Sequence, residues 1–340
     1  MSQPNGQSEL LAGSPNPLKS SGSLDQYSKI DSTPTIGVEF GRGIQLSAWL
    51  KEPNSDALIR DLAILVSERG VAFFRDQDLT IDEQRLLGTS LGELTLKPQS
   101  TSELGSEISI ITSERKGEYT YGDRSQFASN EWHSDITFEP IPSDYSILKI
   151  HTIPTINGCV TGGDTLWASG YEVYDRLSPS FAAYSKVFQT MAKALGIELR
   201  SGIRGSPHNF GDALEAVHPV IRVNPVTGWK SVFVNRSFTR RILGVTKDES
   251  DKILEYLYAL VDQNHNLQVR FKWEKNSLGH LGQPEQFPCC NVRWDYESER
   301  RVGNRVVSLG EKPYFSPNGV SRRAALGLSH SYGWVGEGPK

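Results

Sequence analysis

The segment from Trp132 to Phe138 reads WHSDITF and holds the two residues whose types and spacing best suggest chemistry. On a β-strand or a turn at its edge, side chains two residues apart point to the same side. The imidazole of His133 and the carboxylate of Asp135 can therefore reach one metal ion. A histidine from elsewhere in the chain would complete a 2-His-1-carboxylate set, which binds non-haem iron and leaves three coordination positions open. Taken alone, the pair is more simply explained as a histidine hydrogen-bonded to an aspartate on a surface turn.

Other sequence blocks accompany this segment. Residues 162–167 read GGDTLW, and Arg300, Arg301 and Arg305 lie near the C-terminus. The remaining blocks are GVAFFRDQ at 70–77, LGEL at 91–94, HPVIR at 218–222, FVN at 233–235 and GEKP at 310–313. In order and spacing, over roughly residues 35–325, the chain resembles the taurine dioxygenase (TauD/TfdA-like) family of Fe(II)/2-oxoglutarate-dependent dioxygenases, and most of all its sulfonate dioxygenases. So many blocks in register are far harder to obtain by chance than one His-x-Asp pair.

The resemblance implies roles for four residues. His133 and Asp135 would be catalytic residues that bind the metal, and Thr165 and Arg301 would bind the carboxylate of 2-oxoglutarate. A guanidinium suits that role because its fork of donors matches a carboxylate, which a lysine binds less specifically. Without the other blocks, GGDT would be an ordinary glycine-rich turn and Arg301 a solvated surface cation.

Two further cations are candidates for binding the substrate. Arg305 follows Arg301 by four residues, on the same side of an extended strand, and the equivalent arginine of the family meets an anionic group of the cosubstrate or, more often, the substrate. A surface salt bridge is the competing interpretation of Arg305. Lys97 falls where taurine-cleaving members carry a substrate-binding histidine. A cation at that position can hold an anion, but the change argues against taurine itself.

The second histidine of the metal set is missing from its expected place. The family carries it in a segment resembling Trp-Asp-Asn-Arg-x-x-x-His, eleven residues before the cosubstrate arginine. Here residues 279–292 read GHLGQPEQFPCCNV, and Cys290 stands eleven residues before Arg301. The flanks on both sides remain similar to the family, so the replacement is local.

Four explanations of this segment stay open. Codons that encode residues 279–291 can be chosen so that the same bases, read in a frame displaced by one base, encode AIWDNRSSFHAAT. That peptide contains the missing motif, so the stretch could be a compensated frameshift or a mis-joined exon. If the chain is as written, Cys289 or Cys290 could be a softer third ligand. His280 could substitute, although it lies ten residues early. Otherwise two side chains alone hold the metal, and the protein is a poor enzyme or a silent binder.

The composition sets broad limits. The chain has 340 residues, a net charge of -4 with mixed signs and 37% hydrophobic residues, which predicts a full core and no nucleic-acid footprint. It lacks an apolar run of membrane-spanning length and a signal-peptide pattern. Three cysteines do not form a disulfide framework. We therefore expect a cytoplasmic protein without nucleic-acid or membrane partners, and leave open whether it forms a homo-oligomer.

Periodicity predicts a mixed fold. Helical patterns cover residues 56–68, 80–91 and 246–261, the last two with capping boxes. Short strands are predicted at 71–74, 108–112, 145–150, 220–223, 231–234, 267–273 and 305–309. This indicates an α+β protein with a sandwich, and the resemblance implies a double-stranded β-helix (jelly roll) core with flanking helices. Residues 1–33 and 329–340 are expected to be disordered tails around one dioxygenase domain at 34–328.

The expected activity follows from the resemblance. With Fe(II), 2-oxoglutarate and O2, the protein would hydroxylate a small, anionic, sulfonate-like substrate and release succinate and CO2. A secondary metabolite or an aryloxy acid is the alternative substrate. A catalytically impaired family member is the alternative function.

Overall fold

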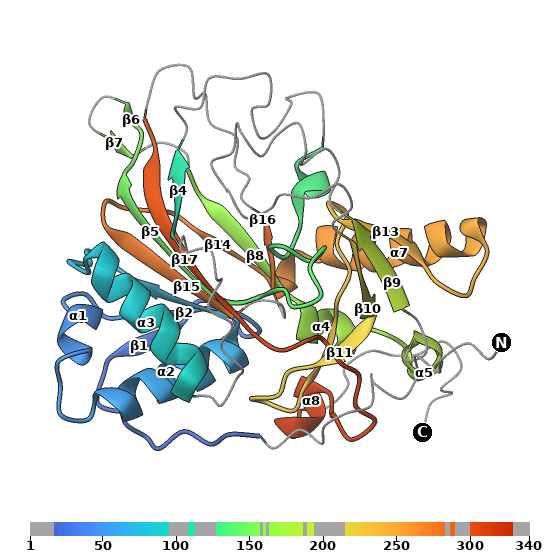
Figure 1. Ribbon diagram of the computed structural model, residues 1–340, viewed down its shortest axis with the longest axis horizontal. Coiled ribbons are helices and arrows are strands. Elements are labelled where there is room, and N and C mark those ends of the chain that lie inside the picture. The colour runs from blue at the N-terminus through green and yellow to red at the C-terminus, as the bar shows by residue number, and fades with distance from the viewer. Residues whose placement is uncertain are drawn as a thin grey trace.

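The computed structural model of the protein describes residues 17–94, 108–112, 127–156, 159–160, 163–185, 189–193, 215–282, 286–289 and 300–328. Within them, helices and β-sheets are both present, so the predicted mixed α and β content is confirmed (Figure 1). No described helix is both long and apolar enough to cross a membrane.

The larger sheet has seven strands in the order β1-β2-β3-β15-β5-β17-β4. Their bounds are Lys29–Asp31 (β1), Val38–Phe40 (β2), Val71–Phe74 (β3), Ser277–Gly282 (β15), Ser143–Thr152 (β5), Val302–Leu309 (β17) and Ile108–Thr112 (β4). Only β2 and β3 pair in parallel; the other neighbours are antiparallel. Helices α2 (Ser55–Arg69) and α3 (Ile81–Leu94) pack together and cover one face of this sheet (Figure 1).

A second, three-stranded sheet has the order β14-β8-β16, with bounds Gln268–Phe271, Thr165–Ser169 and Gln286–Cys289. Aromatic side chains join it to the larger sheet. The rings of Phe73 and Phe271 stack with centroids 4.0 Å apart, and Trp167 and Trp273 are buried in the same cluster. This layer of rings fixes how β8, which begins at Thr165, lies against the larger sheet.

The remaining elements form a second part of the core beside these sheets. They are the strands β9 (Gln189–Lys193), β10 (Glu215–Pro219), β11 (Ile221–Val223), β12 (Lys230–Val232) and β13 (Thr239–Ile242), with helices α4 (Gly170–Asp175), α5 (Pro179–Ser185) and α7 (Lys247–Asp262). The short elements α1 (Leu46–Trp49), α8 (Arg322–Ala325), β6 (Thr155–Ile156), β7 (Cys159–Val160) and the 3-10 turns η2 (Ala128–Glu131) and η3 (His265–Leu267) complete the described fold. Apolar residues of α4, α7, β11 and β12 pack into one cluster.

Local sequence signals explain the main helices. The hydroxyl of Thr246 accepts a hydrogen bond from the Glu249 N–H, and the Glu249 carboxylate accepts one from the Thr246 N–H, so the predicted capping box is confirmed. Thr80 and Glu83 make the same pair of bonds at the start of α3. Helix α2 ends at Gly70, whose φ of 80° suits glycine.

The prediction of a disordered tail up to Thr33 is wrong for residues 17–33. Strand β1 pairs with β2, and the buried carboxylate of Asp61 in α2 accepts hydrogen bonds from Ser20, Ser21 and Ser23. Serine-rich composition favours disorder only when no partner is near, and here one carboxylate satisfies several donors at once. Residues 1–16 and 329–340 lie outside the described residues.

Candidate active site

His133 and Asp135 lie on a turn that follows η2, and their side chains meet. His133 Nε2 is 3.4 Å from Asp135 Oδ1, and both side chains are largely buried. Two ligand atoms at right angles, each about 2.1 Å from a metal ion, lie about 3.0 Å apart. The observed separation therefore fits two neighbouring ligands of one ion after a small adjustment.

Arg305 of β17 holds the other oxygen of the same carboxylate. Its Nη1 donates to Asp135 Oδ2 at 2.7 Å. The pairing leaves Oδ1 facing His133, so the arginine favours an arrangement in which Asp135 offers one oxygen to a metal. The structure thus places the predicted substrate-binding arginine directly beside a predicted metal ligand.

Thr165 and Arg301 both lie next to the side chain of Trp273. The indole Nε1 of Trp273 donates to Thr165 Oγ1 at 2.9 Å, and the Arg301 guanidinium carbon lies 5.9 Å from the centre of the Trp273 ring. Both predicted ligand residues are buried, with Thr165 2% and Arg301 8% exposed. Because the indole uses a lone pair of the hydroxyl, the O–H proton of Thr165 remains available for an acceptor such as a carboxylate.

Trp273 is a site residue that sequence reasoning missed. The alternation of residues 267–273 predicts only a strand with one buried face, and Trp273 itself follows β14. Its role depends on the pairing of β14 with β8, which sets Phe271 opposite Thr165. A second link on this strand pair joins Arg270 Nε to Asp164 Oδ2 at 2.6 Å and fixes the residue before Thr165.

His280 is not brought to His133 and Asp135. It lies in β15, opposite Ala72 of β3 and Ile147 of β5, with an exposed fraction of 0% and its ring 5.6 Å from that of Tyr145. Among the described residues, neither ring nitrogen has a hydrogen-bond partner. Burial lowers the pKa of His280 to about 3, so the ring is neutral at pH 7. The structure therefore gives no support to His280 as the third ligand.

The other candidates for the third ligand are only partly described. Cys289 ends β16 and pairs with Leu166, and its neighbour Pro288 pairs with Trp167. Cys290 and the substrate candidate Lys97 lie outside the described residues. Within the described parts of the chain, no three His, Cys, Asp or Glu side chains gather as a metal site. The described donors therefore fit two positions of the expected metal set.

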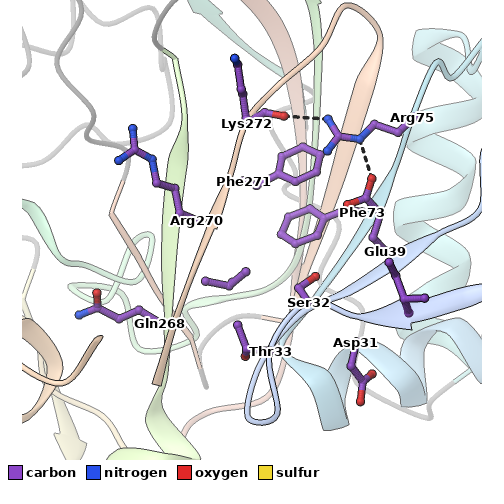
Figure 2. A pocket seen from close by; sticks show the side chains of 12 residues that line it. Asp31, Ser32, Thr33, Glu39, Phe73, Arg75, Gln268, Arg270, Phe271 and Lys272 are labelled. Carbon is purple, nitrogen blue, oxygen red and sulfur yellow. Dashed lines mark hydrogen bonds and ion pairs between the residues drawn. The ribbon is translucent and has the colours of Figure 1, made fainter. Parts of the chain in front are cut away.

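A cavity of about 460 Å³ lies apart from these residues, between β14 and the β1–β2 edge of the larger sheet (Figure 2). The stacked rings of Phe73 and Phe271 line it, and Arg75 lies over Phe271 at 4.0 Å. Arg75 also bonds Glu39 and the backbone oxygen of Lys272. None of the predicted site residues lines this cavity, so we assign it no role.

Comparisons with known proteins show the family of this chain. The family described as "Taurine catabolism dioxygenase TauD, TfdA family" matches residues 29–278. The chain is 40% identical to "Alpha-ketoglutarate-dependent dioxygenase btcD" of Neocamarosporium betae, over 91% of this chain and 98% of that protein. It is 31% identical to "Alpha-ketoglutarate-dependent sulfonate dioxygenase" of Saccharomyces cerevisiae, over 83% of this chain and 63% of that protein.

A solved structure shares the fold. The taurine dioxygenase from Burkholderia xenovorans superposes with a TM-score of 0.66 at 25% identity, over 86% of this chain and 94% of that one. The predicted enzyme class and the predicted use of Fe(II), 2-oxoglutarate and O2 are confirmed at the level of the family. By its sequence blocks, its fold and these matches, the chain belongs to the taurine dioxygenase (TauD/TfdA) family of Fe(II)/2-oxoglutarate-dependent dioxygenases.

Proposed function

We propose that this dioxygenase hydroxylates a small anionic substrate of the sulfonate class, on a double-stranded β-helix core, and releases succinate and CO2. The observation that carries the proposal is the contact of Arg305 with Asp135. It sets a cation directly beside the proposed metal ligands, where an anionic substrate would have to lie to react.

His133 and Asp135 would hold Fe(II), which when bound with 2-oxoglutarate activates O2 for attack on a C–H bond. The protein's own part is to present one imidazole nitrogen and one carboxylate oxygen on the same side. Arg305 keeps the second oxygen of Asp135 occupied, which leaves room for the cosubstrate at the metal.

Thr165 and Arg301 would hold the carboxylate of 2-oxoglutarate that lies away from the metal. Both groups are buried, so their hydrogen bonds to an anion are stronger than in water. The Trp273 indole fixes the Thr165 oxygen and packs near Arg301, and so sets the distance between the two donors before the cosubstrate arrives.

Arg305 would be shared between Asp135 and the substrate. Its side chain is 27% exposed, and a guanidinium has five N–H donors. A sulfonate has three acceptor oxygens that match such a fork. The similarity to the Saccharomyces cerevisiae sulfonate dioxygenase supports this substrate class, whereas a secondary metabolite or an aryloxy acid remains the rival.

We propose that the third ligand is the histidine of AIWDNRSSFHAAT, the peptide that residues 279–291 become in the displaced reading frame. The match to the family ends at residue 278, immediately before this segment. In the displaced reading an isoleucine stands at the position of His280, which is a fully buried strand position whose ring nitrogens have no partner among the described residues. An apolar β-branched side chain suits such a position and a histidine does not.

Sequencing the transcript across residues 276–296 tests the displaced reading. Codons compatible with AIWDNRSSFHAAT in the shifted frame support it, and incompatible codons contradict it. In the latter case two side chains would hold the metal, and we would expect weak Fe(II) binding.

A substrate screen tests the activity. Purified protein with Fe(II), 2-oxoglutarate and O2 is incubated with alkylsulfonates, aryloxy acids and neutral analogues, and succinate is measured. We expect sulfonate-dependent succinate with release of sulfite. Turnover of only the neutral compounds would contradict the proposed substrate class.

A further inference from the structure

The backbone beside the proposed metal ligands is strained. Ile136 follows Asp135 and has a φ of +47°, a left-handed conformation that a β-branched side chain rarely adopts. Such a conformation costs free energy and persists only where the surrounding structure holds it. The residue that follows Asp135 must therefore be held by contacts from other elements.

Those contacts converge on the next residue, Thr137. The backbone oxygen of Thr137 accepts a hydrogen bond from His218 Nε2 at 2.9 Å, and its hydroxyl accepts one from Asn235 Nδ2 at 3.1 Å. All three residues are buried. Thr137 is thus tied to β10 through its backbone and to the loop after β12 through its side chain.

Asn235 is itself fixed at each of its other polar groups. Its Oδ1 accepts from the Phe238 N–H at 2.9 Å, and its backbone oxygen accepts from the Tyr258 hydroxyl and the Thr239 N–H. The side-chain amide therefore donates to Thr137 and accepts from Phe238 at the same time. Neither a carboxylate nor an aliphatic side chain can do both.

The same loop also reaches the second proposed ligand. The Phe238 ring meets the His133 ring edge-on, with centroids 6.2 Å apart and an interplanar angle of 88°. Asn235 therefore holds the turn next to Asp135 through its bond to Thr137. Through the Phe238 N–H it also holds the residue whose ring contacts His133.

We propose that Asn235 is a positioning residue that holds His133 and Asp135 in the arrangement that binds a divalent metal. The inference rests on the proposed metal role of this pair. Asn235 does so indirectly, since it fixes Thr137 and the loop that carries Phe238. A mutation of Asn235 should then loosen residues 134–139 and weaken metal binding together.

The test compares Asn235→Ala with Asn224→Ala in the otherwise unchanged chain. Asn224 is a matched control because it is also buried and its Oδ1 also accepts backbone N–H groups, those of Val226 and Thr227, away from the site. Hydrogen–deuterium exchange is measured on the metal-free protein. We expect exchange in residues 134–139 to become on the order of tenfold faster in Asn235→Ala and to stay unchanged in Asn224→Ala.

Mn(II) affinity, measured by electron paramagnetic resonance with 2-oxoglutarate present in chains that carry AIWDNRSSFHAAT at residues 279–291, is the second readout. Asn235→Ala should weaken binding about 10- to 100-fold, as is usual when a group that orients a metal ligand is lost, and Asn224→Ala should not. Thr137→Val should give a similar loss, and the double variant should lose no more than the more affected single variant because the two changes remove one shared hydrogen bond.

The outcomes separate this inference from the proposed function. Unchanged exchange at 134–139, or faster exchange with parental Mn(II) affinity, would overturn the positioning role. If the chain with AIWDNRSSFHAAT at residues 279–291 binds no Mn(II), the proposed metal site fails, and the exchange result alone then decides whether Asn235 holds the turn.

Discussion

At the scale of residues, individual hydrogen-bond donors set the geometry of the site. Trp273 donates to Thr165, Arg305 donates to Asp135, and Asn235 donates to Thr137. In each case a donor from another element fixes the position of a group at the site, namely the proposed cosubstrate ligand Thr165, the proposed metal ligand Asp135 or the turn residue Thr137. Removing one donor should therefore affect ligand binding more than folding.

The first prediction concerns Arg301 and its neighbour. Arg301→Gln removes the buried positive charge that would pair with 2-oxoglutarate and should weaken 2-oxoglutarate binding about 10- to 100-fold, the range expected for a charged hydrogen bond. Arg301→Lys should recover part of the loss. Calorimetric titration with 2-oxoglutarate measures both. Arg300→Gln, one residue earlier and exposed, is the control, and an equal loss in that variant would contradict the assignment.

The second prediction compares two buried tryptophans. Trp273→Phe removes the N–H that fixes the Thr165 hydroxyl and should weaken 2-oxoglutarate binding about fivefold, the equivalent of roughly 1 kcal/mol. Trp167→Phe removes an indole N–H that has no hydrogen-bond partner among the described residues, so it should leave cosubstrate binding as in the parent. The same titration distinguishes the two variants. Identical behaviour would show that Trp273 acts only through packing.

At the scale of elements, β15 shows a conflict between residue type and environment. His280 occupies the centre of a strand that is paired on both sides, where its ring nitrogens gain no partner among the described residues. An unpaired polar group in such a place costs free energy. The two residues opposite His280, Ala72 and Ile147, are apolar and fully buried.

The third prediction is that His280→Ile stabilises the protein. At pH 7 the free energy of unfolding should rise by about 1–3 kcal/mol, since two unpaired nitrogens leave the core. Urea denaturation measures this change. His265→Gln, which replaces a histidine at an exposed position, should have little effect. A destabilised His280→Ile variant would show that the histidine fits its strand.

The pH dependence of this variant gives an independent check. Burial lowers the pKa of His280 to about 3 from the ordinary value of 6.5. Between these values the unfolded chain binds more protons than the folded chain, so stability falls as the pH falls below 6.5. The parent should lose up to about 1.4 kcal/mol per pH unit more than His280→Ile over this window. Parallel curves for the two proteins would contradict the assigned shift.

At the scale of the whole molecule, much of the architecture could be predicted because its signals are local. Capping residues and apolar periodicity set α2, α3 and α7 close to their observed bounds. The spacing of His133 and Asp135 is also local, so their meeting could be anticipated. The roles of Trp273 and Asn235 could not, because each depends on a pairing with a residue about a hundred positions away.

The structure of the N-terminal segment also could not be predicted from local sequence signals. Its composition is typical of a disordered tail, yet residues 17–31 pack against α2 and β2 because Asp61 offers a buried acceptor. Burial alone would raise the pKa of Asp61, but hydrogen bonds from Ser21, Ser20 and Ser23 together outweigh it and lower the pKa below its ordinary value. A buried carboxylate with this many donors holds the segment to the rest of the chain.

The fourth prediction follows from that contact. Asp61→Ala should lower the free energy of unfolding by about 2–3 kcal/mol, because several serine donors lose a charged acceptor. It should also make residues 17–31 sensitive to limited proteolysis. Asp56→Ala, at an exposed position of the same helix, should cost only a few tenths of a kcal/mol. Equal losses in the two variants would contradict the docking role.

The central claim is an iron site built on His133 and Asp135 and completed by a histidine in the displaced reading of residues 279–291. Anaerobic titration of Fe(II) in the presence of 2-oxoglutarate tests it most directly, with the chain as written and with AIWDNRSSFHAAT at those positions. We predict a saturating metal-to-ligand charge-transfer absorption band in the restored chain, little or no band in the chain as written, and loss of the band in restored protein carrying Asp135→Ala. A folded restored chain without the band, or one that keeps it after Asp135→Ala, would contradict the account.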